Sequence, residues 1–187
     1  SKNKKRYSKP FFFFFYKING ENYKNKINKI QTFILKNNSD YIFITAPENV
    51  AWTLNIRGHD NPNSPIPNCH LILDKKKSIY IIVERKKVKR LVKEKKINRN
   101  NIIDPTKFQS FIKSLKGKKI QIDEKTCSAY YENILNKKFK ILVKEDPIYL
   151  LKSVKNKNEI QSMIDCHILD GVALTKFLYW IKNINKK

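Results

Sequence analysis

Glycine is scarce in this sequence, with 4 glycines among 187 residues. A phosphate-binding loop uses closely spaced glycines so that its backbone can approach the phosphates, and the sequence contains no such loop. The Gly-x-Ser-x-Gly pattern of α/β-hydrolases is also absent. The residues themselves therefore indicate neither phosphate-loop nucleotide chemistry nor serine-based hydrolysis.

Cysteine is rarer still, with 3 residues that lie far apart at Cys69, Cys127 and Cys166. They form no Cys-x-x-Cys pair, and their odd number does not suggest a disulfide framework, so a reducing compartment is expected. Cys127 lies near the start of an expected helix, a position that can lower the pKa of a thiol. A buried structural cysteine is the preferred interpretation there.

No long hydrophobic run is present. The aromatic stretch PFFFFFY, Pro10–Tyr16, is far shorter than the roughly 20 apolar residues that span a bilayer. It follows a basic start, as in a secretory signal, but it leads into KINGEN without a small-residue cleavage site. We expect a cytoplasmic protein in which Phe11–Phe15 form an extended arm packed on the body, because an exposed run of this kind would favour aggregation.

Acidic residues are outnumbered, with 16 Asp and Glu against 40 Lys and Arg and a formal net charge of +24. Such an excess points first to nucleic acid. Nearly all of it is lysine, however, with 35 Lys and 5 Arg, whereas base readout favours arginine. The abundant Asn, Ile, Phe and Tyr fit a compositional bias, so we favour a solvated basic surface with nonspecific nucleic-acid binding. A basic nucleic-acid-binding module stays open as an alternative.

Hydrophobic periodicity predicts alternating helices and strands after a tail or linker at 1–20. The expected helices cover 21–38, 85–96, 104–117, 124–136, 146–154 and 155–184, and the expected strands cover 41–45, a hairpin near 69–83, 97–104, 118–123 and 138–143. This order predicts an α/β domain with three layers and a mixed sheet of about six strands, antiparallel at its start and parallel after it.

The stretch Glu48–Leu73 holds three of the 7 prolines, at Pro62, Pro65 and Pro67. Proline fixes φ and lacks an amide donor, so residues 58–67 are expected to form a rigid loop. The same stretch contains His59, Asp60 and His70. Neighbouring side chains in extended backbone point to opposite faces, so His59 and Asp60 make poor co-ligands and no metal site is predicted.

A second group of polar residues, Cys166, His167 and Asp170, lies on the last expected helix. His167 and Asp170 share a helix face at a spacing of three residues. A surface hydrogen bond or an interface contact is the preferred interpretation for this group.

The proline-rich stretch, NVAWTLNIRGHDNPNSPIPNCHLIL, strongly resembles a motif of the creatinase/prolidase-type N-terminal domains of Xaa-Pro aminopeptidases, in their larger three-domain form. The matching positions are Val50-Ala51-Trp52, Leu54-Asn55, Arg57-Gly58, Asp60, Pro62 and Pro65. Ser64 stands where that family often has asparagine.

A second, distant motif supports the resemblance. Glu145–Ile181 looks like the junction at which the middle domain of this family meets the catalytic domain, and IDEKTCSAYY also resembles a family segment. The similarity runs from about Tyr16 to the end of the chain. It implies a creatinase-like α/β domain over 21–155 with ribonuclease-H-like topology, and over 156–187 the first helix of a truncated catalytic domain with the pita-bread fold.

The resemblance also implies an activity for the intact enzyme, the removal of an N-terminal residue that precedes proline. Two divalent metals, usually manganese, would activate water in the catalytic domain. None of the metal ligands can be placed in this chain, and Asp165 and Asp170 belong to the junction motif. We therefore expect a non-catalytic part that is inactive alone, either an expressed fragment or a truncated gene product.

In the family, such domains cover the active-site cleft, restrict it to short peptides and support dimerisation. Asn55, Arg57 and Asp60 are the candidate residues for this role, since they could fix the proline-rich loop or line the edge of the cleft. The expected partners are the catalytic domain of the same enzyme and a second copy in a homodimer. A non-catalytic binding relative of the pita-bread family stays open as an alternative.

Overall fold

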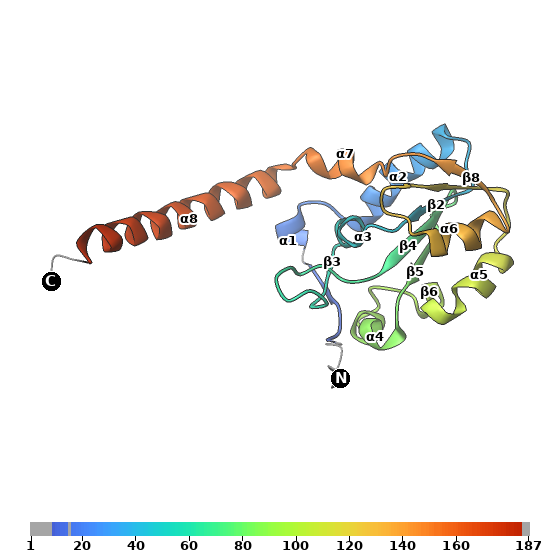
Figure 1. The fold of residues 1–187 in the computed structure, drawn as a ribbon, viewed down its shortest axis with the longest axis horizontal. Helices are drawn as coiled ribbons and strands as arrows, with labels where there is room; N and C mark the ends of the chain where they lie inside the picture. Colours follow the sequence, from blue (N-terminus) through green and yellow to red (C-terminus); the bar gives the residue numbers. More distant parts are fainter. Residues whose placement is uncertain (1–8, 15, 185–187) are drawn as a thin grey trace.

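A six-stranded mixed sheet forms the centre of the molecule in the computed structural model, which describes residues 9–14 and 16–184 (Figure 1). Its strands are β2 (Tyr41–Ile44), β4 (His70–Asp74), β5 (Ile79–Ile82), β6 (Ile102–Ile103), β7 (Lys119–Ile122) and β8 (Lys140–Val143), in the order β6-β5-β4-β2-β7-β8. The β2–β4 and β4–β5 pairs are antiparallel, and the other pairs are parallel. The predicted fold class and strand number are confirmed.

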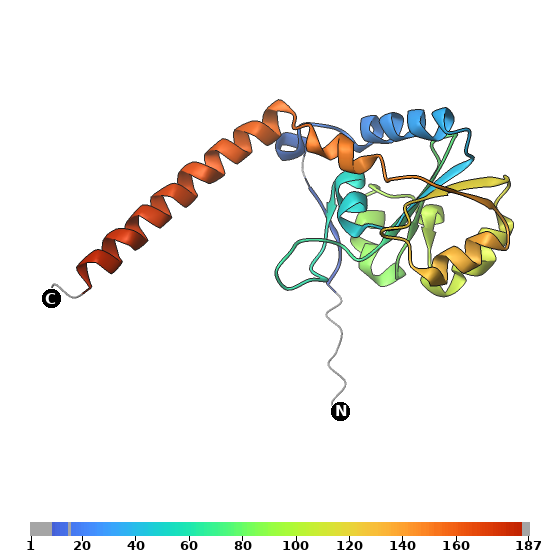
Figure 2. The ribbon, with the colours of Figure 1, turned by 45° about the horizontal axis from the view of Figure 1, so that its top comes forward.

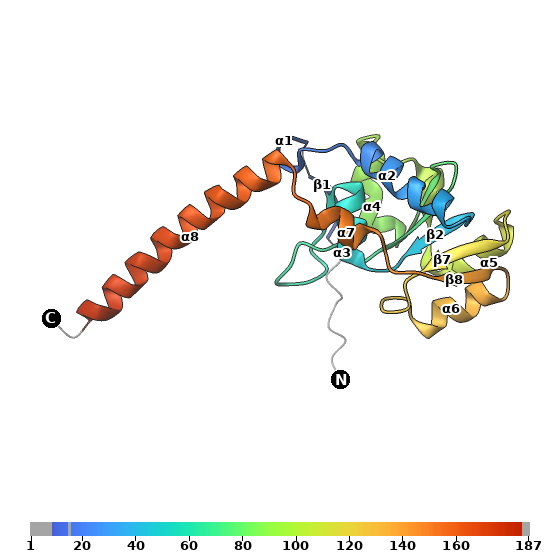
Figure 3. The same cartoon turned by 90° about the horizontal axis from the view of Figure 1, so that it is seen from above.

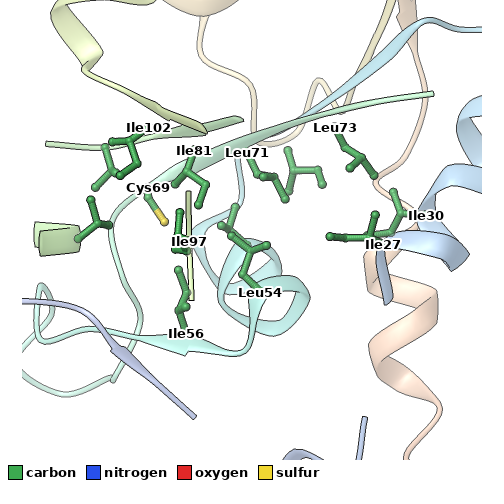
Figure 4. Close-up of a cluster of buried hydrophobic side chains, with 14 of the residues drawn as sticks. Ile27, Ile30, Leu54, Ile56, Cys69, Leu71, Leu73, Ile81, Ile97 and Ile102 are labelled. Carbon is green, nitrogen blue, oxygen red and sulfur yellow. The ribbon is translucent and has the colours of Figure 1, made fainter. Parts of the chain in front are cut away.

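Strand side chains alternate between two hydrophobic clusters, one on each face of the sheet. Ile42 and Leu71 belong to the first cluster, whereas their neighbours Phe43 and Ile72 belong to the second. Because successive side chains of a strand point to opposite faces, two cores separated by one sheet give three layers. Figure 4 shows the first cluster, where apolar side chains from the sheet meet those of the covering helices.

Helices cover both faces. Buried residues of α2 (Tyr23–Lys36), α3 (Pro47–Leu54) and α4 (Arg85–Lys93) complete the first cluster, and those of α5 (Phe108–Ser114) and α6 (Ala129–Asn136) complete the second. Two 3₁₀ turns, Arg99–Asn101 and Pro105–Lys107, flank β6. The helix expected over 104–117 is therefore divided, and its regular part begins at Phe108.

Two expected boundaries differ from the structure. Helix α3 was not anticipated, although Pro47 at its first turn is a favoured helix start and its Val50 and Leu54 are buried. Helix α6 begins five residues later than 124, at Ala129. The reason is a local turn in which the Asp123 side chain accepts the Lys125 N–H at 2.9 Å, which competes with helix formation.

The N-terminal arm is packed as expected where the structure describes it. Phe11 is fully buried, and β1 (Phe12–Phe13) pairs antiparallel with β3 (Ile56–Arg57). After the short helix α1 (Tyr16–Asn19), the chain enters α2. Residues 1–8, which the predicted tail includes, and Phe15 lie outside the described residues.

The chain leaves the body through α7 (Ile148–Ser153) and continues as α8 (Lys157–Asn183), a single helix of 27 residues. Figures 2 and 3 show α8 projecting away from the sheet and its covering helices. None of the described helices, α8 included, combines the length and apolar composition needed to cross a bilayer.

Candidate functional site

The predicted proline-rich loop follows α3 and β3 and is closed by backbone bonds. Gly58 N–H donates to the Pro65 carbonyl at 3.0 Å, and Asn61 and Ser64 form an isolated bridge inside the loop. A Cβ at Gly58 would lie 2.9 Å from the Pro67 Cα and 3.0 Å from the Phe11 ring. Glycine is therefore required here because the arm packs directly under the loop.

Asn55 ends α3 in the left-handed conformation, with φ of 54°, which asparagine tolerates better than most residues. It is 2% exposed. Its Nδ2 donates to the Glu21 carbonyl at 2.9 Å, and its Oδ1 accepts from Lys26 Nζ at 2.7 Å. Both ends of the side-chain amide are thus used inside the domain.

Lys26 is a buried lysine that sequence analysis missed. Its Nζ also donates to the Trp52 carbonyl at 2.9 Å and lies 4.2 Å from the centre of the Trp52 ring. Burial lowers its pKa to about 8, an effect that the nearby Glu159 and Glu21 carboxylates partly oppose. The signal for it was the spacing, because Lys26 is four residues before the core residue Ile30 and so shares its helix face.

Arg57 is half-buried beneath the arm. Its Nη1 donates to the Ala51 and Ile56 carbonyls at 3.2 and 2.9 Å, and its guanidinium lies 4.8 Å from the centre of the Phe14 ring. Burial lowers the pKa of the guanidinium from its ordinary value. These contacts tie β3 to the end of α3.

Asp60 connects the loop to α4. Its Oδ2 accepts the Asn68 N–H at 2.7 Å, and its Oδ1 lies 2.9 Å from Lys87 Nζ. The pair is largely buried, with side-chain exposures of 9% for Asp60 and 13% for Lys87. The same lysine accepts the Phe11 N–H at its backbone carbonyl. Loop, arm and helix therefore meet at Lys87, a second residue that sequence analysis did not identify.

The two histidines of this region do not converge. His59 is exposed and packs on the Phe12 ring, with 5.3 Å between ring centres. His70 lies between Phe43 and Tyr131, and its Nδ1 is 3.0 Å from the Thr45 carbonyl oxygen. Burial lowers the pKa of His70. Within residues 9–14 and 16–184, no three His, Cys, Asp or Glu side chains are grouped so that they could hold a metal ion.

Neither Cys69 nor Cys127 has a lowered thiol pKa. Burial raises the pKa of Cys127 to about 11 and also raises the pKa of the fully buried Cys69. Since a reactive cysteine needs a lowered thiol pKa, the structural interpretation of Cys127 fits its surroundings. In the polar group on α8, Cys166 Sγ donates to Asp170 Oδ2 at 3.9 Å.

The start of α8 is closed by a capping box and is tied to α1 through Asn156. Asn156 Oδ1 accepts the Glu159 N–H at 3.0 Å, and Glu159 Oε2 accepts the Asn156 N–H at 2.9 Å, which satisfies two free amides at the helix start. Asn156 Nδ2 also donates to the Asn19 carbonyl at 2.8 Å. Gly20 packs so closely that a Cβ there would lie 2.4 Å from Asn156 Oδ1.

A buried polar group holds the preceding segment. Asn49, which is fully buried, donates to Asp146 Oδ2 at 2.7 Å and accepts from Lys152 Nζ at 2.6 Å. The Asp146 N–H donates in turn to Asp123 Oδ2 at 2.9 Å. Burial raises the pKa of Asp146, although bonds from the Ile148 N–H and Asn49 oppose the shift. The path from the sheet to α8 is therefore built from fixed polar contacts.

Beyond this base, no residue of α8 is buried. The exposed large apolar residues of the helix are Ile160, Met163, Ile164, Ile168, Leu169, Val172, Leu174, Phe177, Leu178, Tyr179, Trp180 and Ile181. Exposed apolar surfaces of this extent commonly mark interaction sites.

Comparison with known sequences identifies the same family as the motifs do. Residues 2–159 match the creatinase/prolidase N-terminal domain family. Xaa-Pro aminopeptidase 1 of Dictyostelium discoideum is 34% identical over 189 residues, which cover 91% of this chain and 27% of the relative. Xaa-Pro aminopeptidase ApepP of Drosophila melanogaster is 31% identical over 156 residues, covering 80% and 25%. The chain thus spans about a quarter of the length of these relatives.

Solved structures share the fold. The X-prolyl aminopeptidase of Caenorhabditis elegans, described as a cytosolic enzyme with a di-nuclear active site, aligns with a TM-score of 0.81 at 19% identity. The alignment covers 97% of this chain and 31% of that one. The prolidase of Pyrococcus horikoshii OT3 aligns with a TM-score of 0.56 at 23% identity, covering 80% of this chain and 41% of that one.

Proposed function

The chain belongs to the creatinase/prolidase N-terminal domain family, and from this membership we propose that it is the non-catalytic N-terminal part of a Xaa-Pro aminopeptidase. Its partner is the catalytic domain of the same enzyme, which removes an N-terminal residue preceding proline in the cytoplasm. The relatives named Xaa-Pro aminopeptidase, of which this chain spans about a quarter, support the proposal.

The observation that carries the proposal is the contrast along α8. Its first turn is capped by Asn156 and Glu159 and is tied to α1 through Asn156, whereas no side chain along the rest of the helix is buried. A helix held at one end and apolar along its length supplies a rigid connection whose surface is completed by another domain. We assign that surface to the catalytic domain.

Asn55, Arg57 and Asp60 act in this proposal as positioning residues for the proline-rich loop. Their polar atoms bond to backbone carbonyls, to a backbone N–H and to buried lysines inside the domain. The loop that they hold, residues 58–67, faces the cleft and limits the length of the peptide that can enter. A rigid loop suits this role because little conformational entropy is lost when a peptide binds against it.

The two divalent metals that such an enzyme requires do not fit the described residues of this chain, because no group of three possible ligands occurs among them. Their ligands belong to the catalytic domain, and manganese is our proposal for the metal. Homodimerisation is likewise a proposed role of the intact protein.

A chimera tests the proposal. This chain replaces the matching quarter of the Dictyostelium relative, and kcat/KM is measured on X-Pro peptides of increasing length in the presence of Mn²⁺. We expect turnover by the chimera and none by the chain alone. Arg57→Ala frees the Ala51 and Ile56 carbonyls. In the chimera it is expected to reduce the difference in kcat/KM between short and long peptides.

Lys76→Ala serves as the matched control, since Lys76 is exposed on the β4–β5 turn. Identical length preferences for Arg57→Ala, Lys76→Ala and the unsubstituted chimera would remove the loop from the cleft. Turnover of an X-Pro peptide by this chain alone would contradict the assignment of a non-catalytic part.

A further inference from the structure

A groove of about 880 Å³ lies between the N-terminal arm and α4. Its lining includes aromatic rings, cations and one carboxylate, from Phe12, Phe13, His59, Arg90, Glu94 and Lys96, and Glu94 Oε1 lies 2.7 Å from Arg90 Nε. The Phe12 and His59 rings pack at 5.3 Å, and Lys96 Nζ lies 5.3 Å from the centre of the Phe13 ring. The groove continues past His59 into a second hollow of about 550 Å³ beside Asn61 and Pro62.

The surface beside this groove is the most basic part of the described chain. Between residues 85 and 99, eight of nine lysines and arginines are exposed, and Glu94 is the one acidic residue. Three of the chain's 5 arginines, Arg85, Arg90 and Arg99, lie in this span. A general lysine bias does not account for three arginines in one short span, of which Arg90 lines the groove together with Phe12 and Phe13.

The orientation of α4 decides what kind of polyanion suits this surface. Its apolar residues Val88 and Leu91 are fully buried in the first cluster. A helix that binds a membrane must insert its apolar face between lipids, and α4 has no such face to offer. The exposed His59 ring and the half-buried Phe12 and Phe13 rings lie instead in the groove beside the helix, where a chain of flat groups joined by anionic links can enter.

We propose that this groove and the basic face of α4 bind single-stranded nucleic acid. Proteins that bind single strands combine a positive track for the phosphates with aromatic rings on which bases stack, and both are present here. Bases would stack on the Phe12–His59 pair, while Arg90, Lys93 and Lys96 contact the phosphates. The inference goes beyond the proposed peptidase role and does not depend on it.

Fluorescence anisotropy with a labelled oligothymidylate of about 15 nucleotides tests the proposal on the full chain. We expect the triple change Arg90→Gln, Lys93→Gln and Lys96→Gln to raise Kd about tenfold or more. It should also reduce the slope of log Kd against log salt by about 2, because three phosphate contacts are lost. His59→Leu, alone or with Phe12→Leu, should raise Kd up to about tenfold and leave the salt slope unchanged.

Matched controls separate this site from the net charge. Lys76→Gln, Lys137→Gln and Lys138→Gln remove three exposed lysines elsewhere, and Tyr130→Leu removes a ring that is 64% exposed on α6. Both controls should change Kd less than about twofold. Equal losses in the two triple variants would overturn the proposal, since binding would then follow bulk charge.

The rings are tested by competition as well. If polyglutamate displaces the oligonucleotide at equal charge concentration and the His59→Leu variant binds the oligonucleotide unchanged, the site is one for acidic polypeptides and the proposal is wrong.

Lysine acetylation mapped by mass spectrometry gives a readout without substitutions. Bound oligonucleotide should protect Lys89, Lys93 and Lys96 and leave Lys76 and Lys77 reactive.

Discussion

Helices α2 and α8 both carry isoleucines four residues apart but lie in opposite environments. In α2, Ile30 and Ile34 are fully buried against the sheet, whereas Ile164 and Ile168 of α8 are 48% and 61% exposed. The pattern of apolar residues therefore identifies a helix and its apolar face, but it does not show which surface covers that face. The body derives its stability from tertiary packing, and α8 within this chain depends on its capping box and intrinsic helix propensity.

The largest expected effect comes from removing an aromatic ring in each region. Phe43 is 2% exposed and packs against Phe108 and Tyr131, so Phe43→Ala should lower the free energy of unfolding by about 3–5 kcal/mol. Phe177 is 52% exposed on α8, and Phe177→Ala should change it by less than about 0.5 kcal/mol. Urea unfolding followed by near-ultraviolet circular dichroism measures both. Similar losses would mean that α8 packs on the body in solution.

A second contrast concerns Gly58→Ala, at the first residue of the proline-rich loop, where the chain lies against the arm. In Gly58→Ala, the new Cβ meets the Pro67 backbone and the Phe11 ring at 2.9 and 3.0 Å, so arm and loop must separate. We expect a loss of about 1–3 kcal/mol, together with faster proteolysis near residue 10. An unchanged unfolding midpoint would show that the arm does not pack under the loop.

Lys26 provides the third test, through pH. Its pKa is about 8 in the folded chain against 10.5 as the ordinary value, so between these pH values the unfolded chain binds more protons. The free energy of unfolding should consequently rise with pH from about 8 to 10.5, and below about 8 Lys26 contributes no slope. Lys26→Met should abolish this rise and cost about 1–2 kcal/mol at pH 7, since two acceptors lose their donor.

Lys24→Met, at an exposed position of the same helix, is the control for that titration and should retain the rise. Other lysines and tyrosines titrate in the same range, so the informative quantity is the difference between the unsubstituted chain and each variant. The free energy of unfolding of the unsubstituted chain minus that of Lys26→Met should rise between pH 8 and 10.5. A fall of this difference over the same range would contradict the burial of the Lys26 ammonium.

The architecture was predictable because it depends on short-range patterns. The short apolar runs in YIFI and HLILD predict buried strands, and the polar turn DKKKS predicts the hairpin. Helix α3 is hard to recognise in the sequence because its eight residues precede a proline-rich loop, although Pro47 marks its start. The composition of the central sheet thus followed from sequence, whereas α3 did not, and individual boundaries depended on local side-chain bonds such as that of Asp123.

The candidate residues were predictable as a group, but their contacts were not. A motif identifies Asn55, Arg57 and Asp60 as special, yet only the fold shows that Lys26 and Lys87 are their partners. Those partners come from helices 29 and 27 residues away in the chain. In a chain with 35 lysines, nothing local distinguishes two buried lysines from the exposed majority, apart from the apolar face on which Lys26 lies.

The smallest expected effect has the opposite sign and concerns α8 itself. Gly171 lies mid-helix, and a Cβ there meets nothing within 4 Å. Gly171→Ala should therefore stabilise α8 by somewhat less than about 1 kcal/mol, because alanine loses less backbone freedom in a helix than glycine does. Ellipticity at 222 nm should rise slightly, while the unfolding midpoint of the body stays constant. The same substitution thus destabilises the body at Gly58 and strengthens the helix at Gly171, since only Gly58 lies against packed neighbours. A lower ellipticity for Gly171→Ala would imply that another surface of this chain already covers that part of α8.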